Sequence, residues 1–273
     1  MLDSKVSVYI PTHNRSQMLI RAVSSVLNQS YKNIEVIVCD DGSQDDTQMI
    51  MQQWIKYDSR IRYIRSQSPQ GANSARNKAL EQAQGDFVTG LDDDDFFLPT
   101  RIDNFIRHYD DKYAFLYSQR RVVDKRRSRN SEHYIGELTL SSLLHKNVVG
   151  NQVFVKRSLL ESINGFDEAL PSWQDYDCWV RLMLKQNLAL GLPDVDYIMD
   201  TSHEGQRITA SAKALEGALQ FYKKYQAKMS PSQCKTLESE ILMMTKEKLT
   251  LLESLPLMNR HNFKKLIYRL ANK

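Results

Sequence analysis

Two runs of carboxylates interrupt apolar stretches of the sequence. Asp40-Asp41 ends the run IEVIVCDD, and Asp92 to Asp95 stand between GDFVTGL and FFLP. Adjacent like charges repel one another, and an unpaired charge at the border of a core is unfavourable. The longer run therefore predicts a positively charged partner. The alternative is a solvated acidic turn in which Asp95 caps the following helix.

These carboxylates follow segments that have the pattern of strands in a parallel sheet. We expect strands at 5–11, 34–41, 60–66 and 85–93, with helices between them at 16–29, 45–58 and 71–84. This alternation is typical of βαβ units. Ligands of such sheets bind at the carboxyl ends of the strands, so both acidic runs should lie at the same edge.

The composition is that of an ordinary globular protein, with 41% hydrophobic and 26% charged residues among 273. No run approaches the roughly 18 apolar residues of a membrane span. Three cysteines without a C-x-x-C pair favour a reducing compartment and argue against a zinc site, so we expect a cytoplasmic protein. Neither phosphate-binding glycine motif is present, and Phe97 occupies the position at which a calcium-binding EF-hand loop needs glycine.

The pattern becomes helical after about Gly205. Helices are expected at 208–229 and 232–255, and Pro231 is well placed to open the second. We therefore expect a sheet domain at 1–204, with halves at about 1–105 and 106–204, and a helical region at 205–273.

The last fifteen residues combine apolar and basic side chains at helical spacing. This pattern predicts either a helix on the inner face of the membrane or one that packs against the helical hairpin or a second subunit. The apolar members are Phe263, Leu266, Ile267 and Leu270, and the basic members are Arg260, Lys264, Lys265, Arg269 and Lys273.

Several motifs occur in one order along the chain: VSVYIPTHNR, CDDGSQDDT, GANSARNKAL, GDFVTGLDDDD and SWQDYDCWVRL. Together they resemble the family 2 inverting glycosyltransferases. The resemblance covers roughly residues 5–105, resumes at 163–182 and ends by about 210. It implies the GT-A fold, an α/β architecture with a mostly parallel Rossmann-like sheet flanked by helices. It also implies transfer of a sugar from a UDP-sugar to an acceptor hydroxyl.

The resemblance implies that the acidic run binds a metal ion and the sugar-nucleotide donor. Asp94 corresponds to the metal ligand of the family D-x-D motif, and Asp92 lies nearer the ribose and diphosphate. An extended backbone would turn both of these side chains to one side and Asp93 to the other. A bound Mg²⁺ or Mn²⁺ would neutralise the charge that grows on the diphosphate. In the later stretch DTSHEGQRIT, His203 is a further metal candidate and Arg207 a diphosphate candidate.

Further donor contacts follow from the resemblance, and each has a structural alternative. Asp41 could accept the uracil N–H or instead belong to an Asp-Gly turn. Arg15 and Arg76 could be ordinary helix residues at the surface. The complete set of expected donor residues is Pro11, Thr12, Asn14, Arg15, Asp40, Asp41, Arg76, Asp92, Asp93 and Arg207.

The segment SWQDYDCWVRL resembles the family E-D-x-D-x-W motif, which makes Asp175 the expected general base. Gln174 stands where the family commonly has glutamate, and Asp177 is the structural alternative. Gly150, Asn151, Trp173 and Gln174 are expected near the acceptor, although a tryptophan at this spacing could also belong to the core.

Two other classes of protein remain to be weighed. A sugar-nucleotide nucleotidyltransferase would also use acidic metal ligands but usually has a glycine-rich phosphate loop. A nucleic-acid-binding module would explain the basic runs but not carboxylates that repel phosphate, so we expect no nucleic-acid partner. The resemblance implies a saccharide acceptor, lipid-linked in some relatives, in the assembly of bacterial surface polysaccharide.

Overall fold

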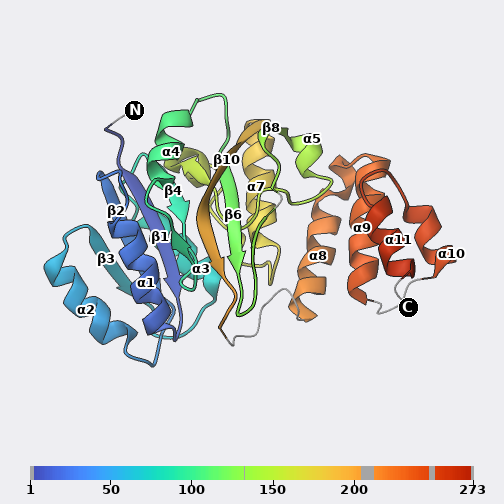
Figure 1. Ribbon diagram of the computed structural model, residues 1–273. Coiled ribbons are helices and arrows are strands. Elements are labelled where there is room, and N and C mark those ends of the chain that lie inside the picture. Colours follow the sequence, from blue (N-terminus) through green and yellow to red (C-terminus); the bar gives the residue numbers. More distant parts are fainter. Residues whose placement is uncertain (1–2, 132, 204–211, 246–249, 272–273) are drawn as a thin grey trace.

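A computed structural model describes residues 3–131, 133–203, 212–245 and 250–271. Its centre is a ten-stranded sheet with the strand order β3-β2-β1-β4-β9-β6-β10-β5, to which β7 and β8 are added beside β6 and β10. Helices cover the sheet, and the C-terminal helices gather beyond α7, away from the strands of the N-terminal half (Figure 1). The expected α/β class is confirmed.

The N-terminal half has the predicted alternation of strands and helices. β1, β2 and β4 are buried along their whole length, as expected for parallel strands covered on both faces. The elements are β1 (Val6–Thr12), α1 (Ser16–Leu27), β2 (Ile34–Asp40), α2 (Thr47–Tyr57), β3 (Ile61–Arg65), α3 (Ala72–Glu81) and β4 (Phe87–Gly90). The carboxyl ends of β1, β2 and β4 therefore bring Thr12, Asp41 and the 92–95 run to one edge.

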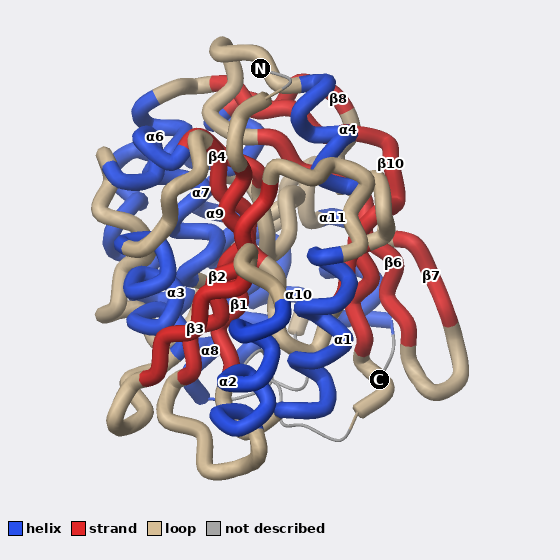
Figure 2. Tube along the Cα trace, turned by 90° about the vertical axis from the view of Figure 1, so that its left-hand side faces the viewer, coloured by secondary structure: helices blue, strands red, loops and turns tan. Residues whose placement is uncertain are grey.

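The second half extends the same sheet with mixed strand directions. β9 is antiparallel to both β4 and β6, while β10 runs parallel to β6. The elements are β5 (Phe96–Phe97), α4 (Arg101–His108), β6 (Leu116–Val123), β7 (Ser128–Asn130), β8 (Gly136–Thr139), α5 (Leu140–Leu143), β9 (Phe154–Lys156), α6 (Arg157–Glu161), α7 (Gln174–Lys185) and β10 (Leu188–Asp200). β6 and β7 form a hairpin that extends from one edge of the molecule (Figure 2).

The C-terminal helices are joined to the sheet domain through α8. The elements are α8 (Ala212–Tyr225), η2 (Gln226–Lys228), α9 (Pro231–Thr245), α10 (Leu251–Ser254), η3 (Leu255–Leu257) and α11 (Phe263–Ala271). Phe221 of α8 is fully buried and stacks on Tyr176 of α7, with 4.3 Å between ring centroids. Pro231 begins α9 as predicted. In the described part of the chain, no helix is both long enough and apolar enough to span a bilayer.

A buried ion cluster also connects α7 with α8. Asp177 is fully buried, and its carboxylate lies 2.6 Å from Arg181 Nε, 2.7 Å from Lys224 Nζ and 2.7 Å from the Tyr225 hydroxyl. The position of α7 therefore depends on α8.

We expect Asp177→Asn to lower the free energy of unfolding by about 3 kcal/mol, because Arg181 and Lys224 would lose a buried partner. Urea denaturation followed by circular dichroism measures this change. The matched control is Asp167→Asn, which removes the half-exposed second partner of Lys224 and should change stability by less than about 1 kcal/mol. Equal effects of the two variants would contradict the structural role of Asp177.

Candidate active site

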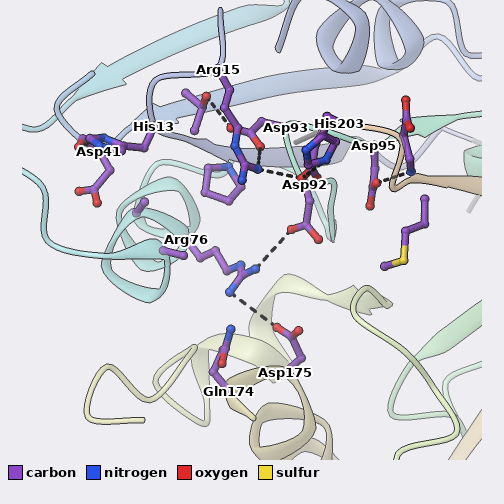
Figure 3. A pocket seen from close by; sticks show the side chains of 17 residues that line it. His13, Arg15, Asp41, Arg76, Asp92, Asp93, Asp95, Gln174, Asp175 and His203 are labelled. Atoms are coloured by element: carbon purple, nitrogen blue, oxygen red, sulfur yellow. Dashed lines mark hydrogen bonds and ion pairs between the residues drawn. The ribbon is translucent and has the colours of Figure 1, made fainter. Parts of the chain in front are cut away.

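A cleft of about 490 Å³ lies at the carboxyl edge of the parallel strands. Its walls come from the ends of β1, β2 and β10, the loop after β4, α3 and the first turn of α7 (Figure 3). The lining residues are Pro11, Thr12, His13, Arg15, Asp41, Ala72, Ala75, Arg76, Asp92, Asp93, Asp94, Asp95, Gln174, Asp175, Met199, Asp200 and His203. The cleft thus unites the two acidic runs with the predicted base.

The acidic run is a turn and not the extended segment that we expected. The N–H of Asp95 donates to the carbonyl of Asp92 at 3.0 Å, which closes the turn. Asp93 is buried, and its oxygens accept from Thr12 Oγ1 at 2.8 Å and Arg15 Nη1 at 2.9 Å. Burial raises the pKa of Asp93 to about 6, against the opposing effect of Arg15. Asp93, which is buried at the cleft wall, thus fixes the position of Arg15.

Asp94 and His203 meet at the cleft wall, where Asp94 Oδ2 and His203 Nε2 lie 3.1 Å apart. Neighbouring ligands of an octahedral cation with bonds of about 2.1 Å are separated by about 3 Å. The two side chains therefore fit a hard divalent cation as adjacent ligands. Among the described residues no three His, Cys, Asp or Glu side chains form a protein cage for a metal. Donor phosphates and water commonly supply the other ligands of Mg²⁺.

Asp92 is held through both carboxylate oxygens. Asn151 Nδ2 donates to Oδ2 at 2.7 Å, and Gln152 Nε2 donates to Oδ1 at 3.0 Å. Arg76 Nη2 lies 3.3 Å from the same Oδ1. Asn151, which was predicted to lie near the acceptor, contacts Asp92. Gln152 was not predicted, because a glutamine after a loop carries no sequence signal of this function.

Gly90 leaves the space that Gln152 needs. A Cβ at this position would lie 1.9 Å from Gln152 Oε1 and 2.5 Å from the Tyr9 ring. We expect Gly90→Ala to displace Gln152 and to raise the donor KM about tenfold, the effect of losing one good hydrogen bond to a charged group. Steady-state kinetics measure this change. The control is Gly136→Ala, which strains the backbone at a φ of 102° but places its Cβ within 4 Å of no atom; an equal rise in KM in both variants would assign the effect to backbone strain and contradict the expectation.

Two residues at the end of β2, Asp40 and Asp41, were predicted to contact the sugar-nucleotide donor, and only Asp41 lines the cleft. Asp41 lines the cleft, and its two oxygens accept backbone N–H groups of Gln70 and Gly71 at 2.7 Å each. Because a carboxylate has about four lone-pair sites, Asp41 can still accept a hydrogen bond from the N–H of a nucleotide base such as uracil. Asp40 is fully buried against Tyr63 and Ser43 and does not line the cleft.

Asn14 also lies away from the cleft lining. Its backbone adopts a left-handed conformation with φ of 54°, and its side-chain oxygen accepts from Gln44 N at 2.7 Å. Asn14 therefore stabilises the loop that carries Pro11 to Arg15. Arg207 lies outside the described residues.

Arg76 points between the acidic run and α7 (Figure 3). Its Nη1 lies 3.7 Å from Asp175 Oδ1, while its Nη2 contacts Asp92. Within the described residues, Asp175 Oδ1 is buried and accepts no hydrogen bond. Burial raises the pKa of Asp175 to about 6, and Asp92 raises it further whereas Arg76 opposes the rise. Asp175 consequently has a carboxylate oxygen that accepts no hydrogen bond and a pKa raised toward the operating pH, as a general base requires.

The first turn of α7 sets the direction of Asp175. Trp173, immediately before the helix, has φ of 62°, which is an unusual conformation for a residue with a side chain. Its ring packs on Tyr176 and Phe221 in the core. Gln174 lines the cleft, and its buried Oε1 has no partner among the described side chains. Trp173 and Gly150 do not line the cleft, so of the four acceptor candidates only Gln174 does.

Met199 and Asp200 of β10 line the cleft but were not predicted, and neither was Arg21, which lies outside the lining and contacts Asp200. Arg21 Nη1 lies 2.5 Å from Asp200 Oδ2, and its other amino group donates to the carbonyl of Asp94. These contacts join α1, β10 and the acidic turn. The order of the sequence does not show them, since the residues are far apart and have no common motif.

Comparison with known proteins agrees with this geometry. The family model described as Glycosyl transferase family 2 matches residues 7–161. WcaA of Escherichia coli strain K12, named for colanic acid biosynthesis, is 32% identical over 96% of this chain and 95% of its own. A β-1,3-glucosyltransferase of Campylobacter jejuni, named for a GalNAc(5)-diNAcBac-PP-undecaprenol acceptor, is 42% identical over 41% of this chain and 37% of its own.

Solved structures share the fold at low sequence identity. S. aureus TarS 1-349 in complex with UDP-GlcNAc superimposes with a TM-score of 0.67, at 20% identity over 89% of this chain and 82% of that one. The mannosyltransferase PcManGT of Pyrobaculum calidifontis, in complex with GDP-Man and Mn²⁺, gives a TM-score of 0.63 at 16% identity over 98% and 85%.

The sheet, the helices that cover it and the acid-lined cleft define a glycosyltransferase with the GT-A fold. The chain belongs to glycosyl transferase family 2. It is therefore not a nucleotidyltransferase, which was the alternative enzyme class.

Proposed function

We propose that the protein transfers a sugar from a UDP-sugar to a saccharide hydroxyl with inversion at the anomeric carbon, and that Asp175 is the general base. The observation that carries this proposal is the buried Asp175 Oδ1, which accepts no hydrogen bond and is separated from the Asp94–His203 pair by Arg76 and Asp92 (Figure 3). A base on one side of the cleft and a diphosphate site on the other suit a single displacement. The buried Asp177, whose carboxylate is fully paired, does not suit this role.

The residues of this chain then have separate tasks. The acceptor hydroxyl donates to Asp175, which takes its proton as the oxygen attacks the anomeric carbon. Arg76 keeps its contact with Asp92 while Asp175 becomes neutral, so the cleft retains a cation at this point. Gln174 Oε1, which is buried without a partner, accepts from a second acceptor hydroxyl.

Asp94 and His203 would hold Mn²⁺ or Mg²⁺ together with the donor diphosphate. The cation would neutralise the negative charge that develops on the leaving group. Its support is the 3.1 Å spacing of the two side chains and the Mn²⁺ in the complex of PcManGT. Arg15, held by Asp93 beside Asp94, adds a fixed positive charge to the same wall.

The proposed classes of sugar donor and of acceptor are taken from the ligands and names of similar proteins. UDP is favoured by the UDP-GlcNAc complex of TarS, and a polysaccharide or lipid-diphosphate-linked acceptor by the names of the bacterial relatives. A screen of UDP-sugars and GDP-mannose, read as released nucleotide, tests the donor. Hydrolysis of GDP-mannose alone would contradict a UDP donor, and hydrolysis of no sugar nucleotide would contradict the function.

We also propose that the enzyme acts on the cytoplasmic face of the membrane and that α11 contributes to its attachment. Leu266 is buried against Met243 of α9, so part of the apolar stripe packs within the helical region. Phe263 and Ile267 remain 48% and 44% exposed beside Lys264. This exposed face fits shallow insertion with cations at the headgroups.

We expect Phe263→Ser with Ile267→Ser to lower binding to phosphatidylglycerol vesicles at least about tenfold, since each buried apolar side chain contributes about 1.5–3 kcal/mol. Sedimentation with the full chain measures the bound fraction. The control is Met49→Ser with Ile55→Ser, which removes two similarly exposed side chains of α2. Unchanged vesicle binding with loss of self-association would instead favour a dimer formed through these helices.

A further inference from the structure

The β6–β7 hairpin carries a concentration of positive charge outside the cleft. The segment from Arg121 to Asn130 contains five cations and one carboxylate, a net charge of +4 that equals the formal net charge of the whole chain. The cations, all at exposed positions, are Arg121, Lys125, Arg126, Arg127 and Arg129.

Asp124, the one carboxylate between Arg121 and Asn130, offsets only part of this positive charge. Asp124 Oδ1 accepts the backbone N–H groups of Arg126 and Arg127 at 2.7 Å each, and it thereby shapes the turn. None of the ion pairs among the described residues includes Arg126, Arg127 or Arg129, although the pKa of Asp124 is lowered by these backbone hydrogen bonds and further by the nearby Arg127 and Arg129. Like charges held together in this way repel one another, so the hairpin suits an anionic ligand.

The hairpin also lies directly beside the cleft. Val122 and Val123 of β6 pair with Met199 and Asp200 of β10, both of which line the cleft. Arg129 stands opposite Val122 in the hairpin register. Because side chains alternate along a strand, Arg129 shares its face with Arg120. Arg120 Nη1 lies 3.1 Å from Asn151 Oδ1, next to Asp92.

The cleft alone would repel a negatively charged acceptor. Seven carboxylates line it against two arginines. An acceptor that carries an anion near its reactive sugar would therefore need a separate attraction at the mouth of the cleft. Four of the five hairpin cations are arginines, whose planar forks match phosphate oxygens.

We infer that the β6–β7 hairpin binds the diphosphate of a lipid-linked acceptor and holds its saccharide at the mouth of the cleft. This inference rests on the proposed glycosyltransferase function and specifies its acceptor. The hairpin turn contains no apolar side chain that could insert into a bilayer, so the attraction is electrostatic.

The test uses the full chain and phosphatidylcholine vesicles with or without undecaprenyl diphosphate. We expect the diphosphate to increase cosedimentation of the wild-type protein. The variant Arg126→Gln/Arg127→Gln/Arg129→Gln should lose at least about tenfold in this binding, because a cation near an anionic surface contributes about fivefold. The matched control is Lys213→Gln/Lys223→Gln/Lys228→Gln, which removes three exposed cations of α8 and η2 and should bind as wild type does.

Two further arms separate the sources of negative charge. Phosphatidylglycerol vesicles of equal charge should show a much smaller effect of the hairpin variant; an equal loss would mean that the hairpin recognises general membrane charge and would overturn the inference. Displacement by a soluble anionic oligosaccharide but not by free diphosphate would also overturn it. Sugar-nucleotide hydrolysis should be unchanged in the hairpin variant, so a failure of donor chemistry would count against the proposed function alone.

Discussion

Replacing Asp175 by asparagine should lower kcat by about 10²–10⁴-fold, because the amide keeps the shape of the side chain but cannot take the acceptor proton. The donor KM and donor affinity should stay close to wild type, since Asp94, His203 and Arg15 hold the donor in the proposed arrangement. Initial rates of transfer and calorimetric titration with UDP measure the two quantities separately.

The pH dependence provides a second measurement on the same residue. Burial raises the pKa of Asp175 to about 6, so the basic form predominates above pH 6 and the protonated form below it. The rate of the wild type should therefore fall about tenfold per pH unit below pH 6 and be flat above. The asparagine variant should lack this limb. Near wild-type turnover in Asp175→Asn, with loss of activity in folded Asp177→Asn, would reassign the base.

Asp94→Ala should lower kcat/KM for transfer by about 10³-fold, because a metal that stabilises a leaving diphosphate contributes several kcal/mol. The reason is the position of Asp94, whose Oδ2 contacts both His203 and Arg15. Electron paramagnetic resonance of Mn²⁺ with UDP measures binding independently of turnover. Asp92→Ala should also reduce activity, since it removes the carboxylate that Arg76 and Asn151 hold.

The control for Asp94→Ala is Asp46→Ala, which removes an exposed carboxylate that makes no capping hydrogen bond to α2. Its Mn²⁺ binding and activity should equal those of wild type. Full transfer by Asp94→Ala, or by the wild type in excess chelator, would contradict a metal site at this position.

The N-terminal half was predictable because its local signals agree. β1 and β2 are mainly apolar runs that end at a polar residue, and α1 between them has an apolar face. The second half was not, because β6 contains Arg120 and Arg121 and β10 contains Pro193 and two shifts of register. Pairing with strands distant in the sequence stabilises these segments, and no local pattern records it.

The same difference applies to the site. Asp92, Asp94, Arg76 and Asp175 were expected in the cleft, and they line it. Asn151 and Gln152 contact Asp92 only because β9 lies beside β4, a pairing that brings together residues about sixty positions apart. The extended backbone expected for the acidic run was wrong, since a tight turn closed by the Asp95 N–H and the Asp92 carbonyl forms there.

The ion cluster of Asp177 bears on how this family can be recombined. The family model ends at residue 161, whereas the proposed base is on α7, and α7 is tied by Asp177 to Lys224 and Tyr225 of α8. Consider a hybrid enzyme made by joining the sequences of two family members between α7 and α8. Its general base on α7 would come from one protein, and the α8 residues that hold α7 in place would come from the other. A crossover placed after Tyr225 would transfer the base and its anchor as one heritable unit.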